Sequence, residues 1–264
     1  MGADRRTLVL LALCTATVLL VPLERYLLGG VFWVSALLLL LRDPDAAVRR
    51  RLGAVLACVA LLAAAPIDTD RSTGHMVALG LPFLAAVLGP ALLLRRSDPG
   101  VIRWRFWPRR LRWLDLVYTA LSVPLAWGVI HVYFFVINPE LPTHWPMPQP
   151  RTDDAVWRLF AGINAVGIWD ELFFVNTVFA LLRSVFPFRV ANLAQAVIYS
   201  AVLTDMAFTG IGPVLVFLFA LTQGAMFEES ENLLYVLIVH LVVDAFLVAA
   251  ILAYHYPGYV PGWI

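Results

Sequence analysis

The stretch WRLFAGINAVGIWDELFFVNTVFALL, residues 157–182, is long and apolar enough to cross a membrane, yet two adjacent carboxylates, Asp170 and Glu171, lie near its middle. A charged group at bilayer depth costs from about 3 to more than about 10 kcal/mol, so it normally faces a partner, a cavity or a metal. One interpretation of the pair is structural, with one carboxylate protonated and hydrogen-bonded to a neighbouring helix. The other is a functional site, which requires partners elsewhere in the chain.

The composition of the whole chain indicates a polytopic membrane protein. Of its 264 residues, 61% are hydrophobic and 14% are charged, whereas roughly a quarter of the residues are charged in soluble domains. The formal net charge is +1, and no basic stretch accompanies a soluble platform, so we expect no nucleic-acid partner. Cys14 and Cys58 lie in apolar runs, which predicts neither a disulfide framework nor a cysteine metal site.

Apolar segments of spanning length predict an all-α fold, a transmembrane helical bundle with eight or nine spans. The segments cover approximately residues 7–22, 26–41, 52–66, 76–94, 114–137, 157–182, 190–208, 211–226 and 233–254. Only Pro22, Glu24 and Arg25 interrupt the first two segments, so these form two spans, a tight hairpin or one partly re-entrant element.

The distribution of arginine predicts the orientation. With nine spans and a cytoplasmic N-terminus, only Arg25, Arg71, Arg151 and Arg158 fall outside, and the other basic residues fall inside. The positive-inside rule therefore favours this topology, and we expect an integral protein of the plasma (inner) membrane. Segment 95–113 interleaves arginine with tryptophan and phenylalanine, which is typical of a segment at headgroup level, so membrane lipid is an expected partner.

A proline-rich stretch divides the chain. The sequence NPELPTHWPMPQPRTDD, from Asn138 to Asp154, cannot continue either flanking helix. We therefore predict N-terminal transmembrane helices over residues 1–137, an extracytoplasmic linker over 138–155, a functional core over 156–254 and a short tail over 255–264.

The apolar segments after this linker contain specific polar residues at membrane depth. One apolar segment contains Tyr199 and Asp205, and the last contains His240 and Asp244 at positions i and i+4, which lie on one helix face. With a rise of about 1.5 Å per residue, their depths are compatible with the depth of the acid pair. A lone buried histidine is more often structural than a metal ligand. A histidine and a carboxylate opposite a second carboxylate pair fit a metal ligand as well as they fit a structural role.

The adjacent acids Asp170 and Glu171 resemble a motif of the CPBP family of intramembrane metalloproteases. That family includes the type II CAAX prenyl proteases and bacterial relatives linked to bacteriocin self-immunity. Its first motif is a pair of acids followed by an aromatic residue, arginine and glycine. In WDELFFVN, Asp170 and Glu171 take the acid positions and Phe174 the aromatic one, whereas Val175 and Asn176 replace arginine and glycine.

The two later motifs resemble the family to different degrees. The second is an aromatic residue followed four residues later by histidine, and it aligns with Tyr199 and Leu203, so its histidine is missing. The last is histidine followed four residues later by Asn or Asp, and His240 with Asp244 match both positions. The resemblance covers about residues 160–249.

What the resemblance implies is a metal-dependent endopeptidase that hydrolyses peptide bonds at or within the membrane, acting on peptide or membrane-protein substrates with zinc or another divalent metal. Such a metal polarises the scissile carbonyl, and a carboxylate activates water. Transferred to this chain, Asp170 becomes the general base and Glu171 a supporting or ligating group. The predicted metal or oxyanion residues are His240 and Asp244, with Asp205 as a further candidate ligand and Tyr199 in support.

Two other classes of function remain open. A catalytically inactive family member would act as a membrane partner-binding or immunity protein, with its acids and histidine in a structural network. A proton-coupled transporter would also use intramembrane acids and histidine, but the sequence has neither an inverted repeat nor paired broken helices. The GxGD, GxSxG and HExxH signatures of other protease classes are absent from the sequence.

Overall fold

The computed structural model describes residues 2–107, 112–204 and 210–261, and all regular structure in these ranges is helical. The all-α prediction is therefore confirmed. The α-helices are α1 (Gly2–Leu20), α2 (Tyr26–Leu41), α3 (Ala46–Ala63), α4 (Thr73–Leu94), α5 (Trp113–His131), α6 (Asp153–Asp170), α7 (Ala180–Arg183), α8 (Phe188–Thr204), α9 (Gly212–Ser230) and α10 (Leu233–His255). The remaining elements are the π-helices η1 (Val132–Ile137) and η3 (Glu171–Phe179) and the 3-10 helix η2 (Leu141–His144).

Among the described residues, four helical stretches are long and apolar enough to cross a membrane, judged by length and composition: Thr73–Leu94, Trp113–Ile137, Asp153–Arg183 and Leu233–His255. Helices α2 and α8 are apolar but shorter. These helices are consistent with a polytopic bundle, while the total of eight or nine spans stays a prediction. Helix α6 begins at Asp153, which lies inside the stretch that the sequence predicts to be a linker.

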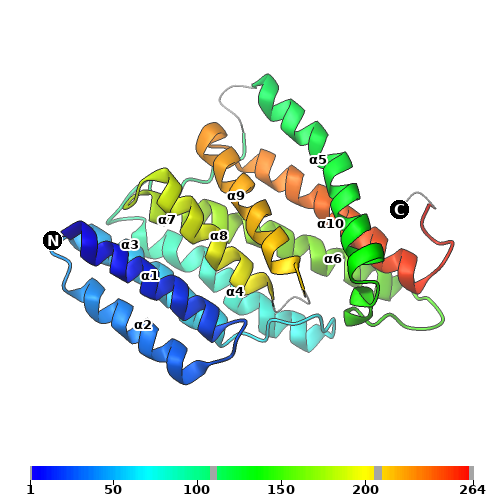
Figure 1. Ribbon diagram of the computed structural model, residues 1–264, viewed down its shortest axis with the longest axis horizontal. Helices are drawn as coiled ribbons and strands as arrows, with labels where there is room; N and C mark the ends of the chain where they lie inside the picture. Colours follow the sequence, from blue (N-terminus) through cyan, green and yellow to red (C-terminus); the bar gives the residue numbers. More distant parts are fainter. Residues whose placement is uncertain (1, 108–111, 205–209, 262–264) are drawn as a thin grey trace.

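The acid pair lies at the centre of the bundle. In Figure 1, α1 and α2 lie side by side at one edge, and α5 lies at the opposite edge, where it packs on α10. The stretch formed by α6 and η3 contacts α4, α8, α9 and α10. The junction of α6 and η3, which carries the two carboxylates, is therefore enclosed by other helices.

Side-chain caps fix where the two site-bearing helices begin. The hydroxyl of Thr152 accepts a hydrogen bond from the backbone N–H of Ala155 at the start of α6. The amide oxygen of Asn232 accepts one from the N–H of Leu234 at the start of α10. Such caps satisfy backbone donors that have no partner within the helix. They therefore help to set which residues of α6 and α10 face each other.

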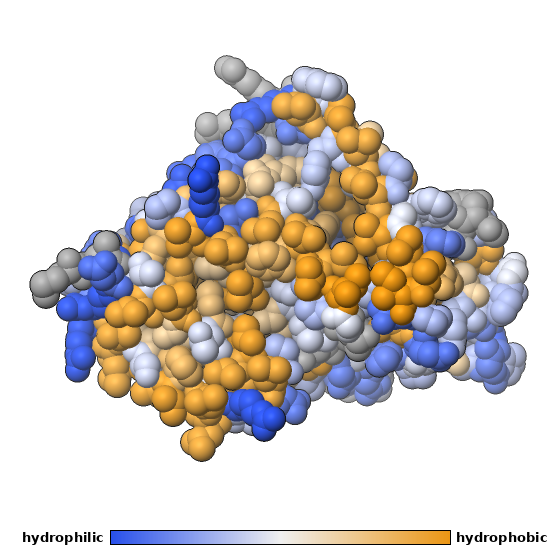
Figure 2. Space-filling view, in the orientation of Figure 1, coloured by the Kyte–Doolittle hydropathy of each residue, from blue (hydrophilic) through white to orange (hydrophobic). Residues whose placement is uncertain are grey.

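Apolar side chains cover much of the outer surface. Figure 2 shows them over the face formed by α2, α9 and α5, with hydrophilic residues gathered toward its margins. Leu27 on α2 is 88% exposed and Leu93 on α4 is 76% exposed. An exposed apolar surface of this extent suits contact with lipid.

An ion pair joins the N-terminal helix to the turn between α2 and α3. The guanidinium of Arg6 donates to both carboxylate oxygens of Asp43, from Nε at 2.8 Å and from a terminal nitrogen at 3.1 Å. This hydrogen bond is the main cause that lowers the pKa of Asp43 below its ordinary value. Because the folded-state pKa is lowered, the stabilisation is present above the unfolded-state value and is lost as pH falls through the folded-state value.

We expect Asp43→Asn to destabilise the protein by about 1–3 kcal/mol at neutral pH, since the substitution removes a charged hydrogen-bond pair. The measurement is the apparent Tm in detergent as a function of pH, with the exposed Glu140→Gln as control. The difference between Asp43→Asn and wild type should shrink as pH falls below about 4. A difference that is the same at every pH would contradict this role for the ion pair.

Candidate active site

Five of the six residues that the sequence singles out come together between α6, η3, α8 and α10. Asp170 ends α6 and Glu171 begins η3, while His240 and Asp244 lie one turn apart on α10. The exposed fractions of these four residues are 1%, 0%, 6% and 4%. Tyr199, from α8, is also fully buried beside them. Asp205 lies outside the described residues.

The imidazole of His240 is the centre of this cluster. Its Nδ1 lies 2.7 Å from Glu171 Oε1, which is a hydrogen bond when the proton is on Nδ1. Its Nε2 lies 3.7 Å from Asp170 Oδ2 and 3.6 Å from Asp244 Oδ1. Glu171 therefore fixes the orientation of the ring, and the other two carboxylates flank its second nitrogen.

Two further side chains donate to the same oxygen of Glu171. The hydroxyl of Tyr199 lies 3.2 Å from Glu171 Oε1 and 3.1 Å from His240 Nδ1. The amide Nε2 of Gln223 donates to Glu171 Oε1 at 3.0 Å and to the carbonyl of Val236 at 2.9 Å. Sequence reasoning missed Gln223. The only signal for it was a single amide within a helix whose other residues are mostly apolar.

The π-helix and its aromatic neighbours hold these groups in place. The ring of Phe174 stacks on Tyr199 with centroids 4.2 Å apart, which holds the phenol toward Glu171. The Trp169 indole, one residue before Asp170, donates to the carbonyl of Phe83 at 2.7 Å and thereby ties α6 to α4. π-Helical turns are rare and occur often at functional sites. Here the turn begins at Glu171 itself.

Gly167 on α6 makes room for the α10 residues. A Cβ at this position would lie 2.0 Å from Asp244 Oδ2 and 2.9 Å from His240 Cδ2. With any other residue here, either the Asp244 carboxylate or α10 would have to shift, so glycine permits this placement of Asp244 against α6. No pattern in the sequence marks this glycine as part of the site.

An apolar cavity opens beside the cluster, between α5, α9 and α10. Its volume is about 380 Å³, and both His240 and Asp244 line it. Leu203 also lines it, at the position where the second family motif has histidine. The remaining lining is mostly aliphatic and aromatic. Small-molecule and peptide sites have this character, with few polar groups in an apolar wall.

The described residues do not form a metal site. Asp170 and Asp244 each keep one buried oxygen without a hydrogen-bond partner among the described residues, as a ligand would. However, no three His, Cys, Asp or Glu side chains in the described ranges group as metal ligands. A catalytic zinc normally needs three protein ligands. The described residues alone thus give no support for a resident zinc, and the metal role of His240, Asp244 and Asp205 stays a prediction.

The comparison with protein families covers the part of the chain that carries the cluster. Residues 152–246 match the family model described as "Type II CAAX prenyl endopeptidase Rce1-like". No curated protein and no solved structure matches the chain. The matched range contains all five clustered residues, and together with the apolar helices it indicates an integral membrane protein. Residues 152–246 are therefore similar to the Rce1-like type II CAAX prenyl endopeptidases, which supports the resemblance to the CPBP family.

Proposed function

We propose that this protein is a CAAX-type intramembrane endopeptidase that hydrolyses a peptide bond of a membrane-associated peptide or protein. The observation that carries the proposal is the 2.7 Å contact between Glu171 Oε1 and His240 Nδ1, buried beside an apolar cavity. A carboxylate that orients an imidazole is a recurrent arrangement in enzymes that move protons. The arginine distribution favours a plasma-membrane protein with a cytoplasmic N-terminus.

The geometry favours Glu171 over Asp170 as the general base. Oε1 of Glu171 accepts from His240, Tyr199 and Gln223, whereas its buried Oε2 has no hydrogen-bond partner among the described residues. Oε2 is thus the atom that can accept a proton from a water molecule. In this scheme Asp170 assists by flanking His240 Nε2. These roles exchange the assignments that the family motif implies.

His240 and Asp244 would meet the substrate, because they line the apolar cavity. The oxygen of water forms a bond to the carbonyl carbon, and the proton from water goes to Glu171 Oε2. With Nε2 protonated, His240 donates a hydrogen bond to the developing oxyanion. The C–N bond then breaks, and the proton held by Glu171 goes to the leaving amine. Asp170 and Asp244 balance the charge of the imidazolium in this buried setting.

We expect the purified protein in liposomes to cleave peptides that carry an apolar or prenylated C-terminal segment. The products would be identified by mass spectrometry. His240→Ala should abolish cleavage, and the exposed His144→Ala should retain it. Cleavage should also survive dialysis against a strong chelator, because the described residues do not group as metal ligands. Equal product yields from His240→Ala and wild type would refute the assignment.

A second candidate function is a catalytically inactive partner-binding or immunity protein. It is favoured by Leu203, an apolar side chain in the cavity wall where the second motif of the family has histidine. Folded wild-type protein that cleaves no peptide, yet retains a bound partner in detergent, would support this function. Cleavage that is lost with the chelator and restored by zinc would instead require ligands outside the described residues.

A further inference from the structure

We propose that a charged pocket at the other end of η3 admits water to Glu171, with Asn176 at its inner end. The pocket has a volume of about 390 Å³ and lies between the segment around Gly100, the end of η3, α7 and the end of α9. This inference rests on the proposed function, since it assigns the route of the hydrolytic water. Asn176 occupies the position at which the first family motif usually has glycine.

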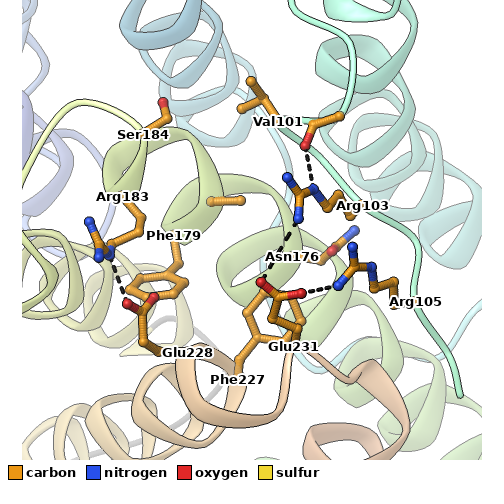
Figure 3. Close-up of a pocket in the computed structure, with 12 residues that line it drawn as sticks. Val101, Arg103, Arg105, Asn176, Phe179, Arg183, Ser184, Phe227, Glu228 and Glu231 are labelled. Atoms are coloured by element: carbon orange, nitrogen blue, oxygen red, sulfur yellow. Dashed lines mark hydrogen bonds and ion pairs between the residues drawn. The ribbon is translucent and has the colours of Figure 1, made fainter. Parts of the chain in front are cut away.

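The mouth of the pocket is strongly polar. Figure 3 shows Arg103 and Arg105 pointing toward Glu231, and Arg183 toward Glu228. The Arg183 Nε donates to Glu228 at 3.0 Å, Arg103 lies 3.8 Å from Glu231, and Arg105 forms a hydrogen bond with Glu231. These side chains are all partly or fully exposed. Exposed ion pairs keep their hydration, so this mouth holds water rather than lipid.

Asn176 connects this hydrated mouth to the interior. Its exposed fraction is 0%, and it lines the pocket beside Phe179 and Phe227. Figure 3 shows its amide on the side of the pocket where Arg105 and Glu231 lie. Neither the nitrogen nor the oxygen of this amide has a hydrogen-bond partner among the described residues. Buried amides are normally paired with protein or with water, so this one is a binding position for water.

The next polar atoms lead to the proposed base. Glu171 is five residues before Asn176, which is one turn of the π-helix they share, since its backbone bonds join i and i+5. Glu171 Oε2, Gln223 Oε1 and both amide atoms of Gln195 are also buried without partners among the described residues. Gln195 lies against Gly224, next to Gln223, because a Cβ on Gly224 would be 3.3 Å from Gln195 Oε1. In the proposed route, water passes from Asn176 to Glu171 along these buried polar groups.

The path implies that water and substrate reach the site from different sides. The charged pocket and the apolar cavity share no lining residue among those described. The cavity presents aliphatic and aromatic walls to the substrate beside His240 and Asp244, whereas the pocket presents ion pairs and an amide. A substrate that fills the cavity would therefore leave the water route open. Hydrolysis at membrane depth requires a supply of water that is separate from the substrate cavity.

The test is the chemical accessibility of position 176. In a background in which Cys14 and Cys58 are replaced by Ala, the protein would carry Asn176→Cys or the control Thr177→Cys. Thr177 is equally buried, but its hydroxyl donates to the Leu172 carbonyl at 2.9 Å and it does not line the pocket. The probe is trimethylammonioethyl methanethiosulfonate, a permanently charged reagent that reaches a thiol only through water. The rate is read as the mass shift of the protein in liposomes.

We expect Asn176→Cys to react about ten-fold or more faster than Thr177→Cys, because thiol reactivity depends on access. Adding Ala180→Trp, which fills the pocket wall, should bring the Asn176→Cys rate down to the control rate. Equal rates at positions 176 and 177 would overturn the water route. Labelling requires no cleavage, so rapid modification of an inactive protein would refute the proposed function while supporting the route.

A second readout uses the native Asn176. Ala180→Trp alone should lower kcat about five-fold or more and leave KM unchanged, since it obstructs water and not the substrate cavity. An unchanged kcat in a folded Ala180→Trp protein would contradict the route even where Asn176→Cys fails to fold. A raised KM with unchanged kcat would also overturn it, because that result would place substrate in the charged pocket.

Discussion

Glu171→Gln is expected to lower the cleavage rate by about 10²- to 10⁴-fold, the range that general bases contribute. The amide keeps the size of the side chain and can still accept from Tyr199 through its oxygen. It cannot take a proton from water, and it removes the carboxylate that orients His240 at 2.7 Å. The measurement is kcat on a cleavable peptide in liposomes, with the thermal transition of the variant recorded beside it.

The matched control for this prediction is the neighbouring carboxylate. Asp170→Asn also replaces a carboxylate with an amide, and the carboxylate that it removes lies 3.7 Å from His240 Nε2. We expect a smaller loss from Asp170→Asn than from Glu171→Gln, because Asp170 assists the histidine and does not receive the proton. The opposite order, with Asp170→Asn inactive and Glu171→Gln active, would return the role of base to Asp170, as the family motif implies.

Sequence patterns were sufficient to predict which residues would meet. His240 and Asp244 are four residues apart on a helix, so a shared face followed from helical geometry alone. The burial cost of Asp170 and Glu171 indicated a partner elsewhere, and the candidates were on the segment with Tyr199 and Asp205 and on the last helix. The depth estimate brought Tyr199 to the same level. The structure places these five side chains in one cluster.

The division of roles within the acid pair could not be predicted, for a physical reason. Adjacent residues on an α-helix point about 100° apart, and a change to π-helical winding at Glu171 alters that angle. The run from Phe173 to Phe179 is buried on every side, so its sequence carries no periodicity that would distinguish the two windings. The contact between Glu171 and His240 therefore depends on a backbone feature that the pattern does not encode.

Gln223 and Gly167 were missed because each acts through a neighbour. Gln223 contributes one hydrogen bond to Glu171 from a helix whose other residues are mostly apolar. Gly167 contributes by having no side chain, and a glycine within an apolar helix usually means only reduced helix propensity. Their roles become visible only when α9 and α10 are placed against α6 and η3. Asp205 lies outside the described residues, so its suggested part in a metal site stays a prediction.

Gly167→Ala is expected to lower cleavage by about 100-fold, because a displacement of about 1 Å at a catalytic group can have that effect. The added methyl group would lie 2.0 Å from Asp244 Oδ2, so either Asp244 turns away or α10 moves from α6. Both responses take His240 out of its contact with Glu171 or remove the carboxylate that flanks Nε2. Helix propensity alone would instead favour the variant, since replacing Gly with Ala inside α6 raises the free energy of unfolding by about 1 kcal/mol.

Gly162→Ala, in the same helix, separates these two effects. Its Cβ would lie 3.5 Å from Met76 Cε, an ordinary van der Waals contact, so it gains helix propensity without displacing the site. We expect Gly162→Ala to retain full activity and an equal or higher apparent Tm, while Gly167→Ala loses activity. Comparable activity in both variants would mean that Asp244 can leave its position without cost. The α10 carboxylate would then have no part in catalysis, and Glu171 with His240 would have to act without it.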